Sequence, residues 1–246
     1  MNFKTAILST LLLALASTAN AGTISFGSES GNSSSDFNGE MEFLGTTELN
    51  PGFATNLVAP NSPTTAASSS TTYDVDPLTL WIAAIAGSSW VSNTATAGPG
   101  CNDDAECQLN GFYYYETTFS AATGKYDVTL DIMADDTAEV LLNGVVVIPF
   151  GSIGSDSYCS DGQPNCASID MVSFIANLSG SNTLEIIDAQ TGGGPEGVDY
   201  TATFTSTEPS SMTPEPSSIV LMCTGLLGLA LLAFRKAKPF DVALNM

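Results

Sequence analysis

The sequence predicts an all-β sandwich followed by one C-terminal transmembrane helix. Apolar and polar residues alternate through "KYDVTLDIMA", from Lys125 to Ala134, as in a strand with one buried face. Asn143-Gly144 separates two apolar runs and is the strongest two-residue hairpin signal. The third observation is the uncharged run from Ser217 to Phe234, whose 18 residues would form a helix about 27 Å long, close to the thickness of a bilayer's hydrocarbon core.

The chain begins with the features of a secretory signal peptide. Lys4 supplies a positive charge, the stretch from Ala6 to Ala16 is apolar, and Ala19-Asn20-Ala21 is a small-x-small cleavage site. We therefore expect residues 1–21 to be removed and the mature chain to begin at Gly22. An uncleaved membrane anchor is the alternative.

The exported part is predicted to form a succession of short strands. Residues 22–72 are its Ser/Thr/Gly-rich N-terminal part, and residues 73–205 are expected to form the sandwich. β-branched and aromatic residues predict strands at 78–86, 111–121, 125–134, on both sides of Asn143-Gly144, and at 170–178, 182–190 and 198–207. After a linker (206–216) come the transmembrane helix (217–234) and a basic tail (235–246).

Composition excludes several classes of active site. The chain has no histidine, which removes Ser-His-Asp and Cys-His catalysis and the usual zinc sites. Between residues 22 and 216, Lys125 is the one basic residue against 25 of the 26 acidic residues, so the net charge there is −24. Such a surface repels nucleic acid and attracts cations, Ca²⁺ among them. The alternative is that the charge only keeps the exported protein soluble.

Four of the five cysteines lie in the exported part, where oxidation is possible. Of the three connectivities, we favour Cys101–Cys107 and Cys159–Cys166, because each pair brackets a short polar loop. A metal site made of cysteine pairs is the alternative. Cys223 lies inside the predicted membrane helix and should stay unpaired.

The C-terminus combines three features in a fixed order. Pro214-Glu215-Pro216 precedes the apolar run, and Arg235, Lys236 and Lys238 follow it, which places the basic end in the cytoplasm by the positive-inside rule. The alternative for the apolar run is a buried helix of a globular domain.

With the signal peptide, these features resemble the PEP-CTERM sorting signal of Gram-negative bacteria. The resemblance implies an inner-membrane-tethered precursor, recognition and cleavage by an exosortase membrane protease, and delivery to the cell surface or extracellular matrix. It also implies an association with extracellular polysaccharide. Unlike the usual members of that family, this chain continues beyond the basic cluster, from Pro239 to Met246.

The order of strands from Leu78 to Thr205 resembles the galactose-binding-domain-like jelly roll and, more loosely, the PA14 module. Its most specific part is Ala134-Asp135-Asp136 followed by Leu141-Leu142-Asn143-Gly144. In some PA14-type lectins a paired-aspartate loop holds Ca²⁺, so the resemblance makes Asp135, Asp136 and Asn143 candidate calcium or ligand residues. Asp103, Asp104, Asp156 and Asp161 are further candidates by composition.

A purely structural role is the alternative for these residues. Asp135 and Asp136 would then cap a turn by bonding nearby backbone N–H groups, and Asn143 would take a positive φ angle in its hairpin. We expect a non-catalytic surface protein that associates with extracellular polysaccharide or cell-surface glycan. A polysaccharide hydrolase with paired carboxylates is the second hypothesis, although 25 acidic residues make some pair inevitable.

Overall fold

The computed structural model describes residues 22–29, 41–48, 57–60, 62–63, 65–101, 107–154, 159, 161–207 and 222–227. The sandwich belongs to one compact unit, residues 21–208, and residues 222–227 of the second unit are helical. Within these described ranges, no helix is long and apolar enough to cross a membrane. The predicted signal peptide and sorting residues lie outside the described residues, as does most of the predicted membrane helix.

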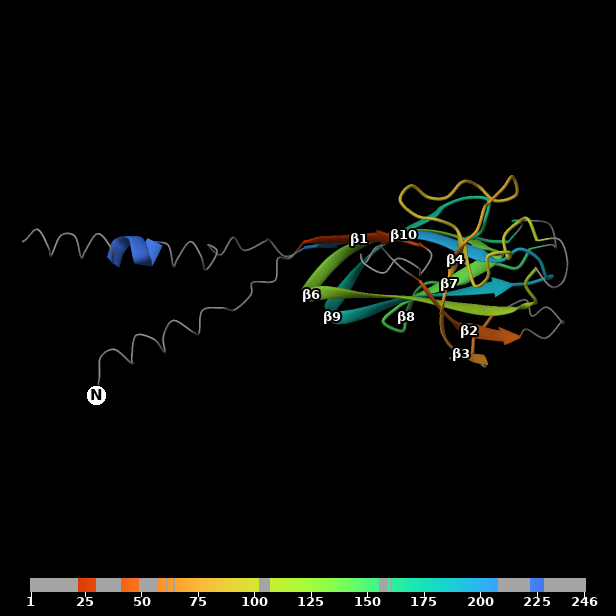
Figure 1. Ribbon diagram of the computed structural model, residues 1–246, viewed down its shortest axis with the longest axis horizontal. Helices are drawn as coiled ribbons and strands as arrows, with labels where there is room; N and C mark the ends of the chain where they lie inside the picture. The colour runs from red at the N-terminus through yellow and green to blue at the C-terminus, as the bar shows by residue number, and fades with distance from the viewer. Residues whose placement is uncertain are drawn as a thin grey trace, which may run out of the picture. The chain divides into compact units, whose positions relative to one another are not determined.

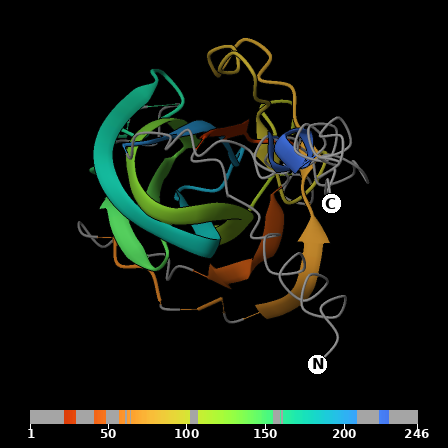
Figure 2. The same cartoon turned by 90° about the vertical axis from the view of Figure 1, so that its left-hand side faces the viewer.

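The protein is an all-β sandwich built on two long antiparallel strands, β6 (Gly111–Asp135) and β9 (Asp170–Gln190) (Figure 1). They pair from Gly111 opposite Gln190 to Ile132 opposite Asp170, with a register shift between Ala121 and Gly124. The register shift bends the ribbon, so that the two halves of each strand lie in opposite layers, as the end-on view in Figure 2 shows.

The two bent strands correct the prediction of separate strands at 111–121 and 125–134, and at 170–178 and 182–190. The intervening residues change the direction of the chain without breaking the ladder, since the bulge accommodates one extra residue in β6. In β9, Gly180 takes a φ of 59°, a left-handed conformation that glycine adopts at little cost.

The remaining strands extend the layers on either side. The hydrogen-bonded path runs β4-β5-β10-β6-β9-β7-β8, with β1 added to β10, β2 added to β6 and β3 added to β2. Every pair is antiparallel. Their bounds are β1 Thr23–Gly27, β2 Glu42–Glu48, β3 Thr65–Thr71, β4 Tyr73–Asp74, β5 Val91–Ser92, β7 Thr137–Leu142, β8 Val145–Ile148 and β10 Gly197–Ser206.

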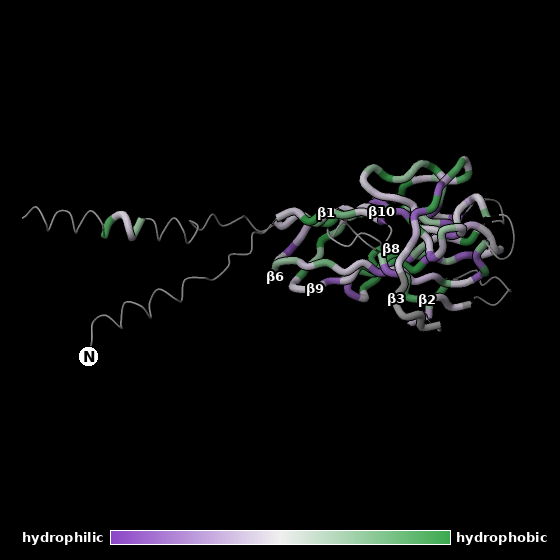
Figure 3. Tube along the Cα trace, in the orientation of Figure 1, coloured by the Kyte–Doolittle hydropathy of each residue, from purple (hydrophilic) through white to green (hydrophobic). Residues whose placement is uncertain are grey.

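The main core fills the space between the layers. Alternate residues of β6, β9 and β10 point into it, as the sequence period of two predicts, and Figure 3 shows apolar and polar stretches interleaved along these strands. Near the bend of β6, Phe119 lies against Phe26 and Phe204, with ring centroids 5.2 and 4.7 Å away. We call this cluster of Phe26, Phe119 and Phe204 the aromatic end.

The predicted strand at 78–86 is wrong. The segment is a loop on the outer face of β6 and β10, in which Leu78 takes a φ of 47° and the Trp81 amide donates to the Pro77 carbonyl. Trp81 and Ile85 are buried, but Ala83 between them is exposed, which does not fit a strand with one buried face. The loop covers Met133 of β6, so its apolar composition serves a second, smaller core.

The hairpin predicted at Asn143-Gly144 is confirmed. It joins β7 to β8, and the φ angles of Asn143 and Gly144 are 52° and 75°, as a two-residue hairpin turn of this type requires. The Asn143 Oδ1 atom accepts a hydrogen bond of 2.9 Å from the Thr183 amide, and its own amide donates to the Thr183 carbonyl. Asn143 therefore fixes this hairpin against β9.

Candidate functional site

At the end of the sandwich opposite the bend, the inward-facing positions change from apolar to acidic. In β9, Leu184 and Ile186 belong to the core, and the next residue on that face is Asp188. In β10, Tyr200 and Val198 belong to the core, and two residues before Val198 the chain places Glu196. We call this region the acidic end; it contains Asp135, Asp136, Asp161, Asp188 and Glu196.

Asp188 and Glu196 are both completely buried. Ser92 Oγ donates a hydrogen bond of 2.6 Å to Glu196, and the Tyr115 hydroxyl donates a second one. Burial raises the pKa of Glu196 to about 7, although these two hydrogen bonds oppose the shift. Burial also raises the pKa of Asp188 well above its usual value, and the negative charge of Glu196 raises it further.

The Asp188 carboxylate has no donor of its own. Neither of its oxygens accepts a hydrogen bond within the part of the chain that the structure describes. The group it faces is the carboxyl of Glu196, and a bond between two carboxyls exists only if a proton lies between them. A buried ionised carboxylate without a partner is costly, so Asp188 needs a proton or another positive charge.

Asp135 and Asp136 follow one another at the end of β6, joined by a cis peptide bond. Asp135 is buried, and its Oδ2 accepts a hydrogen bond of 2.6 Å from Trp81 Nε1. Asp136 Oδ2 accepts bonds of 2.7 and 2.6 Å from the amide and hydroxyl of Thr191. Burial raises the pKa of both carboxyls, and the charge of Asp136 adds to the shift of Asp135.

An open pocket of about 270 Å³ lies at the acidic end. Asp135, Asp136 and Asp161 line one part of it, and the loop from Gln190 to Pro195 lines another. Cys101 and Cys107 also contribute to the wall. The pocket therefore brings together carboxylates from the ends of separate elements, with a glycine-rich loop beside them.

The structure brings only part of the predicted ligand set together. Asp135, Asp136 and Asp161 share the pocket, but Asn143 lies at the far end of β7, about 20 Å away at the usual rise per strand residue. The turn-capping alternative is not what the aspartates do either, because their partners, Trp81 and Thr191, are distant in sequence. Asp103, Asp104 and Asp156 lie outside the described residues.

A preformed metal cluster is not found in the described ranges, where no three His, Cys, Asp or Glu side chains are arranged to hold an ion. The trio Asp135, Asp136 and Asn143 therefore does not fit Ca²⁺ as the sequence suggested. Asn143 lies about 20 Å from the two aspartates, so the three side chains cannot bind one ion together.

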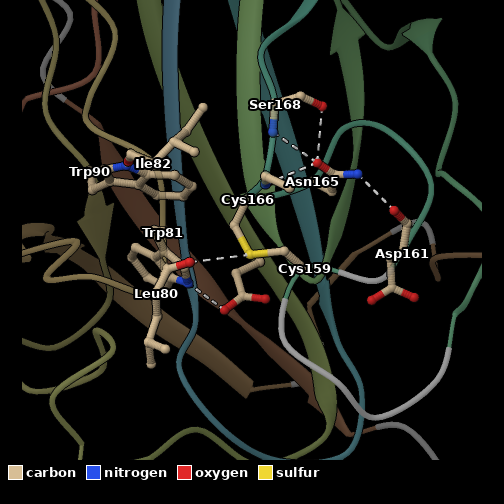
Figure 4. The surroundings of a disulfide bond; sticks show 11 residues. Leu80, Trp81, Ile82, Trp90, Cys159, Asp161, Asn165, Cys166 and Ser168 are labelled. Atoms are coloured by element: carbon tan, nitrogen blue, oxygen red, sulfur yellow. Dashed lines mark hydrogen bonds between the residues drawn. A yellow bond between two sulfur atoms is a disulfide. The ribbon is translucent and has the colours of Figure 1, made fainter.

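Both disulfides of the structure pair neighbouring cysteines in sequence. Cys101 is bonded to Cys107 and Cys159 to Cys166, while Cys223 is free. Figure 4 shows the second bridge beside Trp81 and Trp90, with Asp161 on the same loop. The bridge therefore holds the loop that carries Asp161 against the small outer core.

Sequence reasoning missed Asp188 and Glu196. The signal was present, because continuing the alternation of Leu184 and Ile186 by two residues places a carboxylate at a core position. The same applies to Glu196, which continues the inward face of Val198 and Tyr200. A charged residue in phase with the buried face of a strand deserves as much notice as a motif.

Comparison with known proteins identifies the C-terminal segment. Residues 213–236 match the PEP-CTERM protein-sorting motif. The chain therefore carries this sorting signal, which implies export, sorting to the cell envelope or surface, and processing by an exosortase. Among curated proteins, no sequence matches this chain.

Solved structures similar to the sandwich include a family 35 carbohydrate-binding module from Clostridium thermocellum. It shares 19% identity, with 51% of this chain and 85% of that chain covered, at a TM-score of 0.30. The PA14 domain of the MpAFP antifreeze protein shares 22% identity over 42% of this chain and 46% of its own, at a TM-score of 0.24. A β-glucosidase from Kluyveromyces marxianus shares 13% identity over 37% of this chain and 11% of its own, at a TM-score of 0.26.

Proposed function

We propose that this protein binds extracellular polysaccharide without catalysis, through the pocket at the acidic end. Its precursor is held in the inner membrane of a Gram-negative bacterium by residues 217–234, with Arg235, Lys236 and Lys238 in the cytoplasm. An exosortase cuts the chain at or near Pro214-Glu215-Pro216 and delivers the sandwich to the surface or extracellular matrix.

The observation that carries the glycan proposal is the carboxylate-lined pocket. Sugar hydroxyls are hydrogen-bond donors, and charge-assisted bonds to carboxylates such as Asp136 and Asp161 are stronger than neutral ones. Its volume of about 270 Å³ is close to the lower end of ligand pockets, which suits one sugar unit or the end of a polymer. The net charge of −24 disfavours acidic polymers, so the expected ligand is a neutral glycan.

The glycan proposal is tested on an array that carries both neutral and uronic-acid-containing glycans. Asp136→Asn should weaken binding to a neutral ligand at least about tenfold, as the loss of one charge-assisted hydrogen bond predicts. Asp127→Asn is the matched control, because Asp127 is exposed on β6 and lies about 26 Å along the strand from Asp135. Equal binding by both variants, or no binding by the wild type, contradicts the proposal.

The hydrolase hypothesis keeps one observation in its favour. Asp135, whose pKa is raised, sits beside Asp136, and a protonated acid next to a second carboxylate is the arrangement that glycosidases use. Release of reducing ends from the polysaccharide that the protein binds would establish hydrolysis. Binding without such release supports the non-catalytic role.

The sorting steps have their own test. Replacing Pro214-Glu215-Pro216 by alanines should leave membrane insertion intact but block processing, since the prolines keep this segment extended for a protease cleft. Replacing Arg235, Lys236 and Lys238 by serine should weaken retention or orientation. Intact-mass measurement in the native host, and in one lacking the exosortase, decides: Met246 retained equally in both contradicts cleavage.

A further inference from the structure

Asp188 is the most unusual side chain of the sandwich. It is completely buried, it occupies a core position of β9 between Tyr113 of β6 and Ala138 of β7, and both of its oxygens lack a donor among the described residues. Glu196, also completely buried, faces it from the start of β10. Two carboxylates are thus enclosed together between the layers.

No basic side chain can neutralise this pair. The sequence has no histidine, and Lys125 is the one Lys or Arg between residues 22 and 216. Lys125 is exposed and lies next to the bend of β6, about 33 Å along the strand from Asp135 at the usual rise per residue. A positive charge that compensates Asp188 and Glu196 must therefore come from outside the folded domain, and the net charge of −24 concentrates cations around it.

We propose that Asp188 and Glu196 bind one divalent cation of the Ca²⁺ type between the two layers. The available ligands are all oxygens, two from each carboxylate and one from each of the hydroxyls of Tyr115 and Ser92, which already contact Glu196. That number reaches the lower end of the coordination that Ca²⁺ takes, and the lack of nitrogen or thiolate ligands disfavours Zn²⁺. Two carboxylates balance the charge of one such ion.

The site has a structural consequence for the pocket above it. Asp188 lies two residues before Gln190, and Glu196 follows Pro195 directly, so the two ligands stand on either side of the loop that lines the pocket. A cation bound by both residues holds the two ends of this glycine-rich loop together. The inference does not depend on glycan binding, because the cation would stabilise the fold whether or not the pocket holds a sugar.

The test is thermal unfolding of the purified full-length protein at pH 8, first in EDTA and then in 1 mM CaCl₂. Calcium should raise the Tm by at least about 5 °C, as expected for a ligand near a hundred times its Kd acting on a domain of this size. Asp188→Asn and Glu196→Gln should each remove most of this rise. Asp127→Asn, the same chemical change on an exposed carboxylate, should keep it.

Two further arms keep the inference open to refutation. Asp136→Asn should keep the calcium response, because Asp136 lines the pocket and is not one of the ligands; loss of the response in that variant alone would move the ion to the pocket and overturn the assignment. If neither Asp188→Asn nor Glu196→Gln folds, calcium titration calorimetry of the wild type decides, with one site per chain expected. No heat and no change in Tm would mean that the pair holds only a proton.

Discussion

The two ends of the sandwich are built by the same strands, yet they bury opposite kinds of side chain. At the aromatic end, Phe26, Phe119 and Phe204 from β1, β6 and β10 stack within 6 Å of one another. At the acidic end, the same inward face of β9 and β10 carries Asp188 and Glu196. The alternation of the strands is unbroken between the ends, and only the chemistry of the inward positions changes.

The difference shows that strand periodicity determines which way a side chain points, and not what that side chain contributes. Packing accounts for the aromatic end, where each ring adds buried apolar surface to a closed core. Buried carboxylates do not stabilise a fold unless something compensates them. The acidic end is therefore the part of the molecule whose composition calls for a ligand, and variants at the two ends should behave differently.

The largest effect is expected at the aromatic end. Phe204→Ala removes a fully buried ring that stacks on both Phe26 and Phe119, and should lower the free energy of unfolding by about 4 kcal/mol, mainly through the cavity it leaves. Urea unfolding measures the change. At the other end, Asp188→Leu in EDTA should cost little or even stabilise, because it removes an uncompensated buried charge. If Asp188→Leu lowered the free energy of unfolding as much as Phe204→Ala, the proposed difference between the two ends would be wrong.

The next effect concerns the loop that covers the outer face near the acidic end. Asp199 of β10 accepts hydrogen bonds from the Ile85 amide at 2.8 Å, Ser28 Oγ at 3.1 Å and Ser88 Oγ at 2.5 Å. Asp199→Ala leaves the Ile85 amide without its acceptor, whereas the two hydroxyls can still donate to the Ser89 and Ile85 carbonyls. The substitution should lower the free energy of unfolding by about 2 kcal/mol, as measured by urea unfolding. Asp199→Asn, which keeps an acceptor, should cost less; an equal loss in both variants would show that the charge itself holds the loop.

Asp199 also shows how far the sequence could lead. The alternation in β6 and β10 and the Asn143-Gly144 turn are local signals, and they predicted the strands and the sandwich. The loop from Leu78 to Ala86 is held by Asp199, more than a hundred residues away, and no local propensity encodes that contact.

The candidate site was predictable in the same limited way. Asp135 and Asp136 stood out because they are adjacent in the sequence, whereas Asp188 and Glu196 meet only when β9 and β10 are placed in facing layers. The resemblance to PA14-type lectins made Asn143 a candidate, but β7 separates it from Asp135 and Asp136.

Removal of either disulfide should have an effect of intermediate size on stability. Each closes a short loop, and the chain-entropy model gives about 2 kcal/mol for either. Cys166, however, is completely buried beside Trp81 and Trp90, whereas Cys101 and Cys107 are only partly buried. Replacing both Cys159 and Cys166 by alanine should therefore destabilise more than replacing Cys101 and Cys107, as measured by denaturant midpoints. A larger loss for the Cys101–Cys107 variant would show that the pocket wall contributes more stability than the small outer core.

The smallest effect is a dependence of stability on pH that arises at Asp135. Burial raises the pKa of Asp135, the charges of Asp136 and Asp161 raise it further, and the hydrogen bond from Trp81 opposes the shift only in part. Because the folded pKa exceeds the unfolded value of about 3.9, the stabilisation is complete below that pH and is lost as the pH rises through the folded pKa.

Asp135→Asn keeps an acceptor for Trp81 Nε1 and cannot ionise, so its stability should fall less steeply with pH than that of the wild type. The difference in slope should stay below about 1.4 kcal/mol per pH unit, the limit for one proton. Urea unfolding from pH 4 to pH 8 in EDTA measures both slopes, and Trp81 fluorescence follows the ionisation directly. Parallel curves for the two proteins would mean that Asp135 is ionised in the fold as freely as in water, and that the acidic end is open to solvent at this carboxylate.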